Sequence, residues 1–172
     1  MAVIGIDLGT TNSLAGVWQD GKGVLIPNAF GEYLTPSVVG IGKNQEVFVG
    51  SVAKEMLATQ PYDTFREFKR NMGTNFLYGN GRKKYRAEEL SAFVLRRLKE
   101  DAEKFLGEEV TEAVISVPAY FDDNKRNATK NAGRLAGLKV ERLINEPSAV
   151  ALKHHTAERG AESFIVFDFG GG

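Results

Sequence analysis

The residues best suited to chemistry lie near the start of the sequence, in the stretch IGIDLGTTNS at positions 4–13. An apolar strand pattern ends in a carboxylate, Asp7, and a tight turn of glycine and small polar residues follows: Gly9, Thr10, Thr11 and Asn12. Such a turn can present several backbone N–H groups and hydroxyls to one anion. A carboxylate beside it can hold a hydrated divalent cation. The pattern therefore predicts a site for a metal-bound polyphosphate.

The same pattern recurs in IVFDFGGG at positions 165–172. Asp168 ends the apolar run, and the glycines Gly170, Gly171 and Gly172 follow. An isolated Asp7 could simply cap its own turn, but two copies of strand-Asp-x-Gly predict two similar lobes that share one cleft. We therefore expect the chain to be a fragment, with residues 163–172 forming the first strand and the start of the second phosphate loop of a further lobe.

Composition excludes several classes of function. Lys plus Arg and Asp plus Glu both number 22, so no net charge favours binding to nucleic acid or to a membrane surface. The absence of cysteine excludes disulfides and thiolate metal sites and is compatible with a reducing compartment. No apolar run approaches the roughly 20 residues of a membrane span, and the first strand begins too near Met1 for a signal peptide. We expect a cytoplasmic protein.

The elements that must position these residues follow from periodicity and turn signals. Strands are predicted at 2–8, 13–19, 24–26, 113–117 and 140–144, and helices at 87–106, after Asp122 or Asp123, and at 146–155. The uncharged strand 113–117 is expected to be parallel and buried on both faces. This order predicts a mixed five-stranded sheet with flanking helices.

Residues 1–28 and 87–162 would form the core of the lobe, and residues 29–86 a small inserted α+β subdomain. Within the insertion we predict short strands at 36–41 and 46–49 and a helix at 52–59. A second short helix is predicted after Asp63, which would carry a cluster of apolar residues and one lysine: Phe65, Phe68, Lys69 and Met72.

A series of motifs, in this order along the whole chain, resembles the actin-like ATPase fold and, within it, the heat-shock-70 molecular chaperone family of the DnaK type. They are IGIDLGTTNS (4–13), LTPS (34–37), FKR with Gly73 shortly after (68–73), VISVPAYFDDNKRNATKNAGRLAGL (114–138), LINEPSAVAL (143–152) and FDFGGG (167–172). The FGEYLTPS segment and the short insertion most resemble the HscC-like branch. The resemblance implies a ribonuclease H-like α/β lobe, the N-terminal half of a nucleotide-binding domain.

The resemblance also implies a role for each matching residue. Gly9, Thr10, Thr11 and Asn12 would form the first phosphate loop, and Gly170, Gly171 and Gly172 would begin the second. Asp7 and Asp168 would hold the water shell of Mg²⁺ from opposite sides. Lys69 would stabilise the transferred phosphoryl group, and Glu146 would position the attacking water or the metal's hydration shell. Pro118 and Arg126 would couple the nucleotide state to a substrate-binding domain.

Without the resemblance, plainer interpretations of these residues stay open. Lys69 has the pattern of a solvated helix lysine, and Glu146 that of a first-turn acid favoured by the helix dipole. Pro118 would only end a strand, and Arg126 would lie on a helix surface.

The resemblance implies ATP/ADP and Mg²⁺ as cofactors. It also implies that the parent protein couples ATP hydrolysis to binding and release of unfolded polypeptides, in the heat-shock and stress response, with co-chaperones and through domains outside this chain. Alone, the fragment is expected to lack useful ATPase activity and to self-associate as a dimer. A small-molecule kinase of the same fold and an actin-like filament protein are the alternatives. P-loop and Rossmann signatures are absent.

Overall fold

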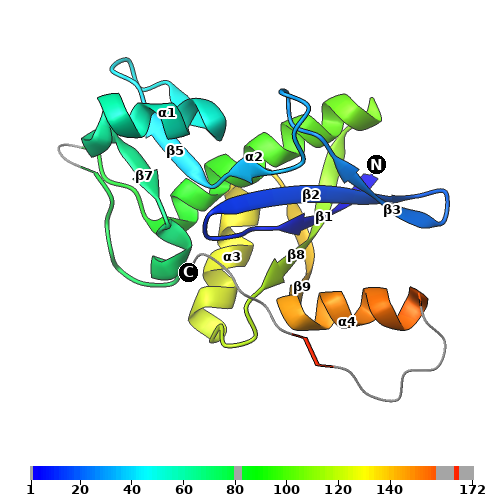
Figure 1. The fold of residues 1–172 in the computed structure, drawn as a ribbon. Helices are drawn as coiled ribbons and strands as arrows, with labels where there is room; N and C mark the ends of the chain where they lie inside the picture. Colours follow the sequence, from blue (N-terminus) through cyan, green and yellow to red (C-terminus); the bar gives the residue numbers. More distant parts are fainter. Residues whose placement is uncertain (1, 80–82, 158–164, 167–172) are drawn as a thin grey trace.

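A mixed sheet forms the main layer of the computed structural model, which describes residues 2–79, 83–157 and 165–166 (Figure 1). Its strands run in the order β3-β2-β1-β8-β9, with the short strand β4 added beside β2. Their bounds are β1 (Ala2–Asp7), β2 (Asn12–Gln19), β3 (Lys22–Ile26), β4 (Thr35–Pro36), β8 (Val110–Val117) and β9 (Lys139–Asn145). The β1–β2 and β2–β3 pairs are antiparallel, and the β1–β8 and β8–β9 pairs are parallel. The five predicted strands are present, and β4 makes a sixth.

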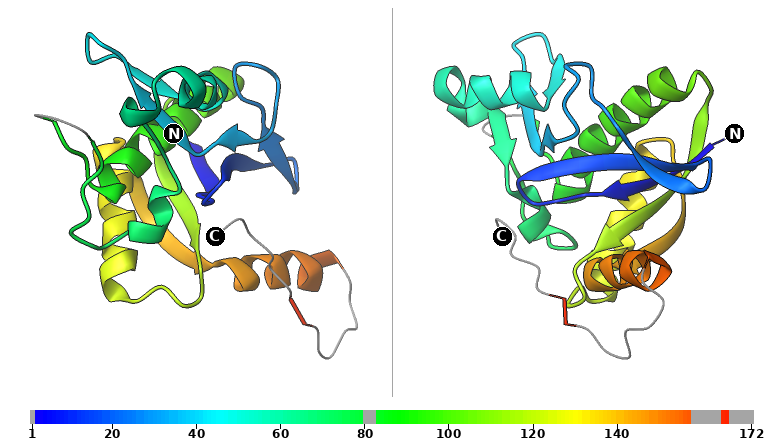
Figure 2. Two further views of the ribbon diagram at one scale, coloured as in Figure 1. Left: turned by 60° about the vertical axis from the view of Figure 1, so that its left-hand side comes forward. Right: turned by 45° about the vertical axis from the view of Figure 1, so that its right-hand side comes forward.

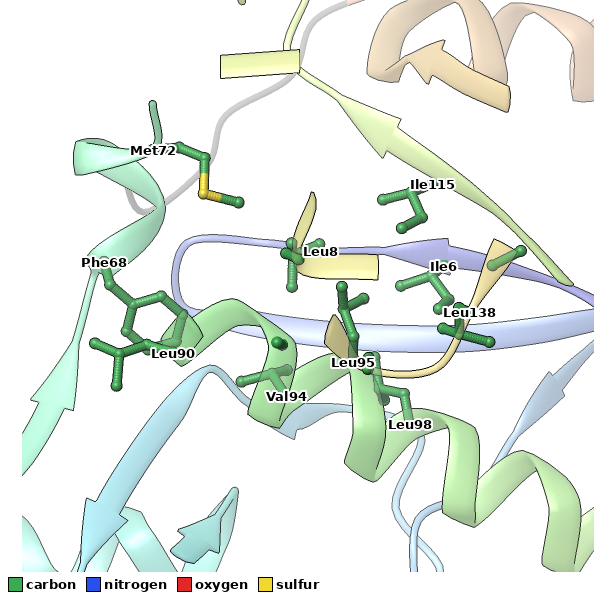
Figure 3. Packing of buried hydrophobic residues seen from close by; sticks show 14 of the residues in the cluster. Ile6, Leu8, Phe68, Met72, Leu90, Val94, Leu95, Leu98, Ile115 and Leu138 are labelled. Atoms are coloured by element: carbon green, nitrogen blue, oxygen red, sulfur yellow. The ribbon is translucent and has the colours of Figure 1, made fainter. Parts of the chain in front are cut away.

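Two helices, α2 (Ala87–Leu106) and α3 (Asp123–Leu135), cover one face of this sheet. In α2 the four-residue spacing of Leu90, Val94 and Leu98 places these side chains on one buried stripe. Figure 3 shows this stripe facing side chains of β1 and β8, among them Ile6 and Ile115. Gly107 ends the helix in the left-handed conformation (φ 70°), as the sequence predicts.

The opposite face of the sheet is only partly covered. The helix α4 (Glu146–Ala157) follows β9 directly and lies on the side of it away from α3 (Figure 2). In β8, Ala113, Ile115 and Val117 are fully buried, whereas Val114 and Ser116 are only half-buried. The expectation of a strand buried on both faces is therefore wrong, although its parallel pairing is confirmed.

Residues 38–66 form a second, three-stranded sheet in the order β6-β5-β7, with α1 (Ser51–Thr59) packed against it (Figure 1). The strands are β5 (Val38–Ile41), β6 (Val47–Val49) and β7 (Thr64–Arg66), and two 3-10 turns follow α1, η1 (Pro61–Asp63) and η2 (Phe68–Asn71). Because β4 lies inside the predicted insertion but joins the main sheet, the boundaries of the inserted subdomain at 29 and 86 stay predictions.

The short helix predicted after Asp63 is wrong. The β-branched and aromatic residues at its start, Thr64 and Phe65, instead extend the second sheet, where Phe65 pairs with Val39. Glu67 then adopts a left-handed conformation (φ 57°), which separates the strand from η2. Lys69 therefore lies in a single 3-10 turn, whose position depends on the strand before it.

Within the described ranges, no helix is both long enough and apolar enough to cross a membrane.

Candidate functional site

Asp7 lies at the carboxyl end of β1, beside the parallel strand β8. Its register partner Ser116 donates a hydrogen bond from Oγ to Asp7 Oδ1 at 2.8 Å. Among the described residues the Asp7 carboxylate has no second hydrogen-bond partner, so Oδ2 remains available to a ligand. Ser116 was not predicted as a site residue, although its place near the end of a predicted parallel strand is where ligand contacts gather.

The turn after Asp7 owes its shape to a glycine. A Cβ atom at Gly9 would overlap the carbonyl oxygen of Asn12, so no other residue fits this backbone without a shift. The two strands β1 and β2 then pair antiparallel, with Asp7 opposite Leu14. The tight turn predicted from the sequence is therefore present, as the tip of a hairpin that needs a glycine at position 9.

Ser37 holds this turn from outside. Its Oγ donates a hydrogen bond to the Gly9 carbonyl at 2.8 Å, and its backbone N–H donates to the Thr11 carbonyl at 2.8 Å. Because the Ser37 hydroxyl proton is used in this way, the 2.9 Å contact between the two hydroxyls is donated by Ser13. Both serines are buried, at 0% and 1% exposure. Ser37 belongs to the LTPS motif, but no local pattern indicated that it contacts the loop.

The three polar side chains of the turn are open to a ligand. Thr10 is half-buried, and Thr11 and Asn12 are exposed. Within the part of the chain that the structure describes, none of these side chains bonds to another protein group. A narrow glycine turn, two free hydroxyls and an amide beside a carboxylate fit a phosphate group with a hydrated cation.

Lys69 is buried, at 7% exposure, and its Nζ lies 2.8 Å from Oε1 of Glu146. The two residues are 77 positions apart, and the bond joins η2 to the start of α4. At Gly73, just after η2, a Cβ would lie 2.8 Å from the backbone carbon of Asn124, so this glycine lets the segment pack closely against the start of α3. Lys69 is therefore not the solvated helix lysine that its sequence context alone permits.

Phe121 and Arg126 extend the contacts of this ion pair. The Phe121 ring centroid lies 5.8 Å from Lys69 Nζ, within cation–π range. Arg126 donates from Nε to the Phe121 carbonyl at 2.9 Å and from a terminal nitrogen to Asn145 Oδ1 at 2.7 Å. The Phe121 N–H donates to the Pro118 carbonyl at 3.1 Å. Pro118 and Arg126 are thus linked to Asn145, the neighbour of Glu146.

The order of the strands places these two groups at one edge of the sheet. Asp7 is in register with Ser116, and Val117 with Asn145, so the ends of β1, β8 and β9 lie side by side. We call the Asp7–Ser13 turn the phosphate loop, and the contacts of Lys69, Phe121, Arg126, Asn145 and Glu146 the charged cluster. Asp168, Gly170, Gly171 and Gly172 lie outside the described residues.

The described residues also form a cavity, which lies away from the phosphate loop and the charged cluster. A cavity of about 530 Å³ opens between Thr111, Lys130 and Lys139, which places it at the opposite edge of the sheet, where β8 and β9 begin. Within the same described ranges, no group of three or more histidine and acidic side chains could ligate a metal ion directly. Mg²⁺ usually keeps several of its waters and needs only one or two carboxylates. Asp7 can supply one of these carboxylates.

The model of a family described as Hsp70 protein matches residues 3–80 and residues 77–172. The two matched segments together include every candidate site residue, from Asp7 to Gly172.

Proposed function

This chain belongs to the Hsp70 family, and we propose that residues 2–157 form one half of a nucleotide cleft for Mg²⁺·ATP. The family and the mixed sheet with flanking helices identify the fold as the α/β lobe of an actin-like ATPase. The sequence is that of a chaperone ATPase domain, which favours the chaperone class over the kinase and filament alternatives. Assignment to the DnaK type or the HscC-like branch stays a prediction.

The observation that carries the proposal is the Lys69–Glu146 contact at 2.8 Å. Two residues proposed as catalytic come from distant parts of the sequence and meet at the sheet edge that also carries Asp7. A buried lysine with one close carboxylate is uncommon unless it has a structural or chemical task. Because the phosphate loop lies nearby, we favour a chemical task for Lys69.

Each residue has a task in this proposal. Thr10, Thr11 and Asn12 donate hydrogen bonds to phosphate oxygens, and Asp7 accepts hydrogen bonds from the metal's waters. When bound, Mg²⁺·ATP supplies the transferable phosphoryl group. Lys69 places a positive charge where negative charge develops in the transition state. Glu146 accepts a hydrogen bond from water and keeps the lysine in position.

We further propose that Asp168 and the glycines Gly170, Gly171 and Gly172 begin the facing half of the cleft. Pro118 and Arg126 would report the nucleotide state to a domain that binds unfolded polypeptide, with co-chaperones as further partners. Their hydrogen bonds through Phe121 to Asn145 support this route, because Asn145 precedes Glu146 in the chain.

Nucleotide titration tests the cleft. A fluorescent ADP analogue with Mg²⁺ should bind the 172-residue chain with an affinity weaker than micromolar, and a version extended through the second lobe at least about 100-fold more tightly. Each charge-assisted hydrogen bond that the facing half would add is worth about 1–3 kcal/mol. Steady ATP hydrolysis by the 172-residue chain, at the rate of the extended version, would contradict the proposal.

A matched pair of variants isolates the metal site. In the extended version Asp7→Asn should lower the Mg²⁺-dependent part of the affinity about 10- to 100-fold, as expected for a group that orients the waters of a metal. Asp20→Asn is the control, because Asp20 is an exposed turn residue with φ 50°, a conformation that asparagine accepts. Equal effects of the two substitutions would contradict the role of Asp7.

Self-association of the 172-residue chain is a separate proposal. Val3, Trp18 and Leu25 lie on the partly covered face of the sheet at 46%, 72% and 48% exposure, and exposed apolar faces favour association. Light scattering at high concentration should give a dimer mass that falls toward the monomer in Trp18→Ser. A monomer at all concentrations would refute this proposal.

A further inference from the structure

Phe121 touches the charged cluster with both its side chain and its backbone. Its ring, 6% exposed, lies beside the Lys69 ammonium at 5.8 Å. Its carbonyl accepts the hydrogen bond from Arg126 Nε, and its N–H donates to the Pro118 carbonyl. One residue therefore contacts the cleft lysine on one side and both proposed coupling residues on the other.

We propose that Phe121 is a positioning residue for Lys69, which holds the ammonium against Glu146 by the face of its ring. This inference rests on the proposed function, because the position of Lys69 matters only if the lysine acts on a phosphoryl group. The contacts close a circuit: Lys69 to Glu146, the adjoining Asn145 to Arg126, Arg126 to the Phe121 carbonyl, and the Phe121 ring back to Lys69.

This closed series of contacts means that a movement of Arg126 is passed on to the Phe121 ring. Because the Arg126 bond fixes the Phe121 peptide group, a shift of the Arg126–Asn145 contact turns this peptide and moves the aromatic ring with it. The aromatic ring then changes its distance from Lys69 without any direct contact between Arg126 and the lysine. Phe121 thus connects the coupling residues to the charge in the cleft.

A purely space-filling role for Phe121 makes different predictions. An aliphatic side chain such as leucine fills a similar part of the core but has no π face to attract a cation. The neighbouring Tyr120 gives a matched control, since it is an aromatic residue that contacts Lys125 at 5.6 Å and has no contact with Lys69 among the described residues. Lys125 Nζ also lies 5.5 Å from the Phe121 ring centroid. A test of the contact between Phe121 and Lys69 must therefore substitute Lys69 itself.

A double-mutant cycle in the 172-residue chain measures the contact directly. Chemical unfolding of Phe121→Leu, Lys69→Met and the double variant should reveal a coupling of about fivefold in the unfolding equilibrium constant, which corresponds to about 1 kcal/mol. The same cycle with Tyr120→Leu should give a coupling below about 1.5-fold. A Phe121–Lys69 coupling as small as that of Tyr120 would overturn the proposal.

Two further measurements keep the test decisive if a variant does not fold. In the wild-type chain, nuclear Overhauser contacts between the Lys69 ε-protons and the Phe121 ring are expected, and their absence would overturn the proposal. In the extended, ATP-hydrolysing version, Phe121→Leu should lower kcat about tenfold with KM changed less than twofold, and Phe121→Tyr should restore kcat. Loss of kcat without rescue by tyrosine indicates a packing role and counts against the proposal.

These results are distinguishable from failure of the proposed function. If the extended version binds no Mg²⁺-nucleotide at all, the nucleotide cleft is wrong, whatever the double-mutant cycle gives. If nucleotide binds and the cycle shows no coupling, the cleft stands and the role of Phe121 is wrong.

Discussion

The phosphate loop and the charged cluster lie at one edge of the same sheet but are held in different ways. The loop is shaped by its own backbone, a glycine and the small hydroxyl residues Ser13 and Ser37. The cluster depends on long side chains that meet from η2, the start of α3 and the start of α4. The turn of the loop is therefore set mainly by its own sequence, with Ser37 as a distant support, whereas the cluster forms only in the complete fold.

The largest effect is expected where the backbone decides the geometry. Gly9→Ala places a Cβ on the Asn12 carbonyl oxygen, so the turn must open and should lose about 3 kcal/mol of stability, the upper end for overpacking. Chemical unfolding measures this loss, and Gly23→Ala is the control because a Cβ there meets nothing within 4 Å. Similar losses in the two variants would show that the loop is not set by its backbone.

A smaller effect is expected in the charged cluster, where side chains can readjust. Glu146→Gln keeps a hydrogen-bond acceptor but leaves the Lys69 ammonium, whose side chain is 9% exposed, without its carboxylate. We expect a loss of about 2 kcal/mol, below the 3–5 kcal/mol typical of a buried pair that loses one member. Urea unfolding provides the value. Glu55→Gln on the exposed side of α1 should change stability by less than about 0.5 kcal/mol.

Ser37 tests whether the loop needs support from outside. Ser37→Ala removes the hydroxyl that donates to the Gly9 carbonyl and leaves the Ser13 hydroxyl without its acceptor. A loss of about 1–2 kcal/mol is expected for such buried groups. Thermal unfolding of Ser37→Ala and of the exposed control Ser148→Ala should separate the two sites. If Ser37→Ala behaves like the control, the loop is self-supporting.

The pair of Arg97 and Asp101, away from the site, shows how burial of a carboxylate changes its pKa and the stability of the fold. Asp101 is 4% exposed, its Oδ2 accepts from Arg97 Nε at 3.3 Å, and its Oδ1 has no partner among the described residues. Burial raises the pKa of Asp101, and the charge of Arg97 offsets this only in part. Folding therefore favours the protonated form of Asp101 relative to the unfolded chain, and this contribution to stability is lost as the pH rises through the folded pKa.

Asp101→Asn should consequently stabilise the chain at neutral pH by about 1 kcal/mol, the lower end for a buried group without a partner. For a chain of this size, that free energy raises Tm by about 2–4 °C. The gain should shrink as the pH is lowered toward the pKa of an unfolded aspartate near 4. Calorimetry at several pH values measures it, and a gain that does not depend on pH would refute the assigned cause.

The sequence predicted the loop better than the cluster, for physical reasons. The glycine turn after Asp7 is a local pattern, and the apolar period of α2 predicts its bounds at 87 and 106 correctly. The segment after Asp63 was assigned wrongly, because only the neighbouring strand β5 makes it a strand. Phe105, an apolar residue near the end of the same helix, is 44% exposed because it lies beyond Ala102, the last buried residue of α2.

The charged cluster could not be derived from local pattern. The contact between Lys69 and Glu146 joins residues 77 positions apart, and only the resemblance to a known family suggested that both serve one site. Ser37 is buried and Ser116 half-buried, and neither was predicted as a support, because a single serine leaves no periodic signal in the sequence. Asp122, one of two candidate caps, is confirmed as the N-cap of α3 by its bond to the Lys125 N–H at 2.9 Å.

Helix α3 is held close to its neighbours by a glycine at each end. Gly133 lies so near Val140 of β9 that a Cβ would overlap its side chain, and Gly73 approaches the first residues of the helix in the same way. At 1.5 Å per residue, the 13 residues of α3 span about 20 Å. A bulkier residue at Gly133 would therefore have to push α3 away from β9, and the shift would strain the close contact that the helix makes with Gly73 at its other end.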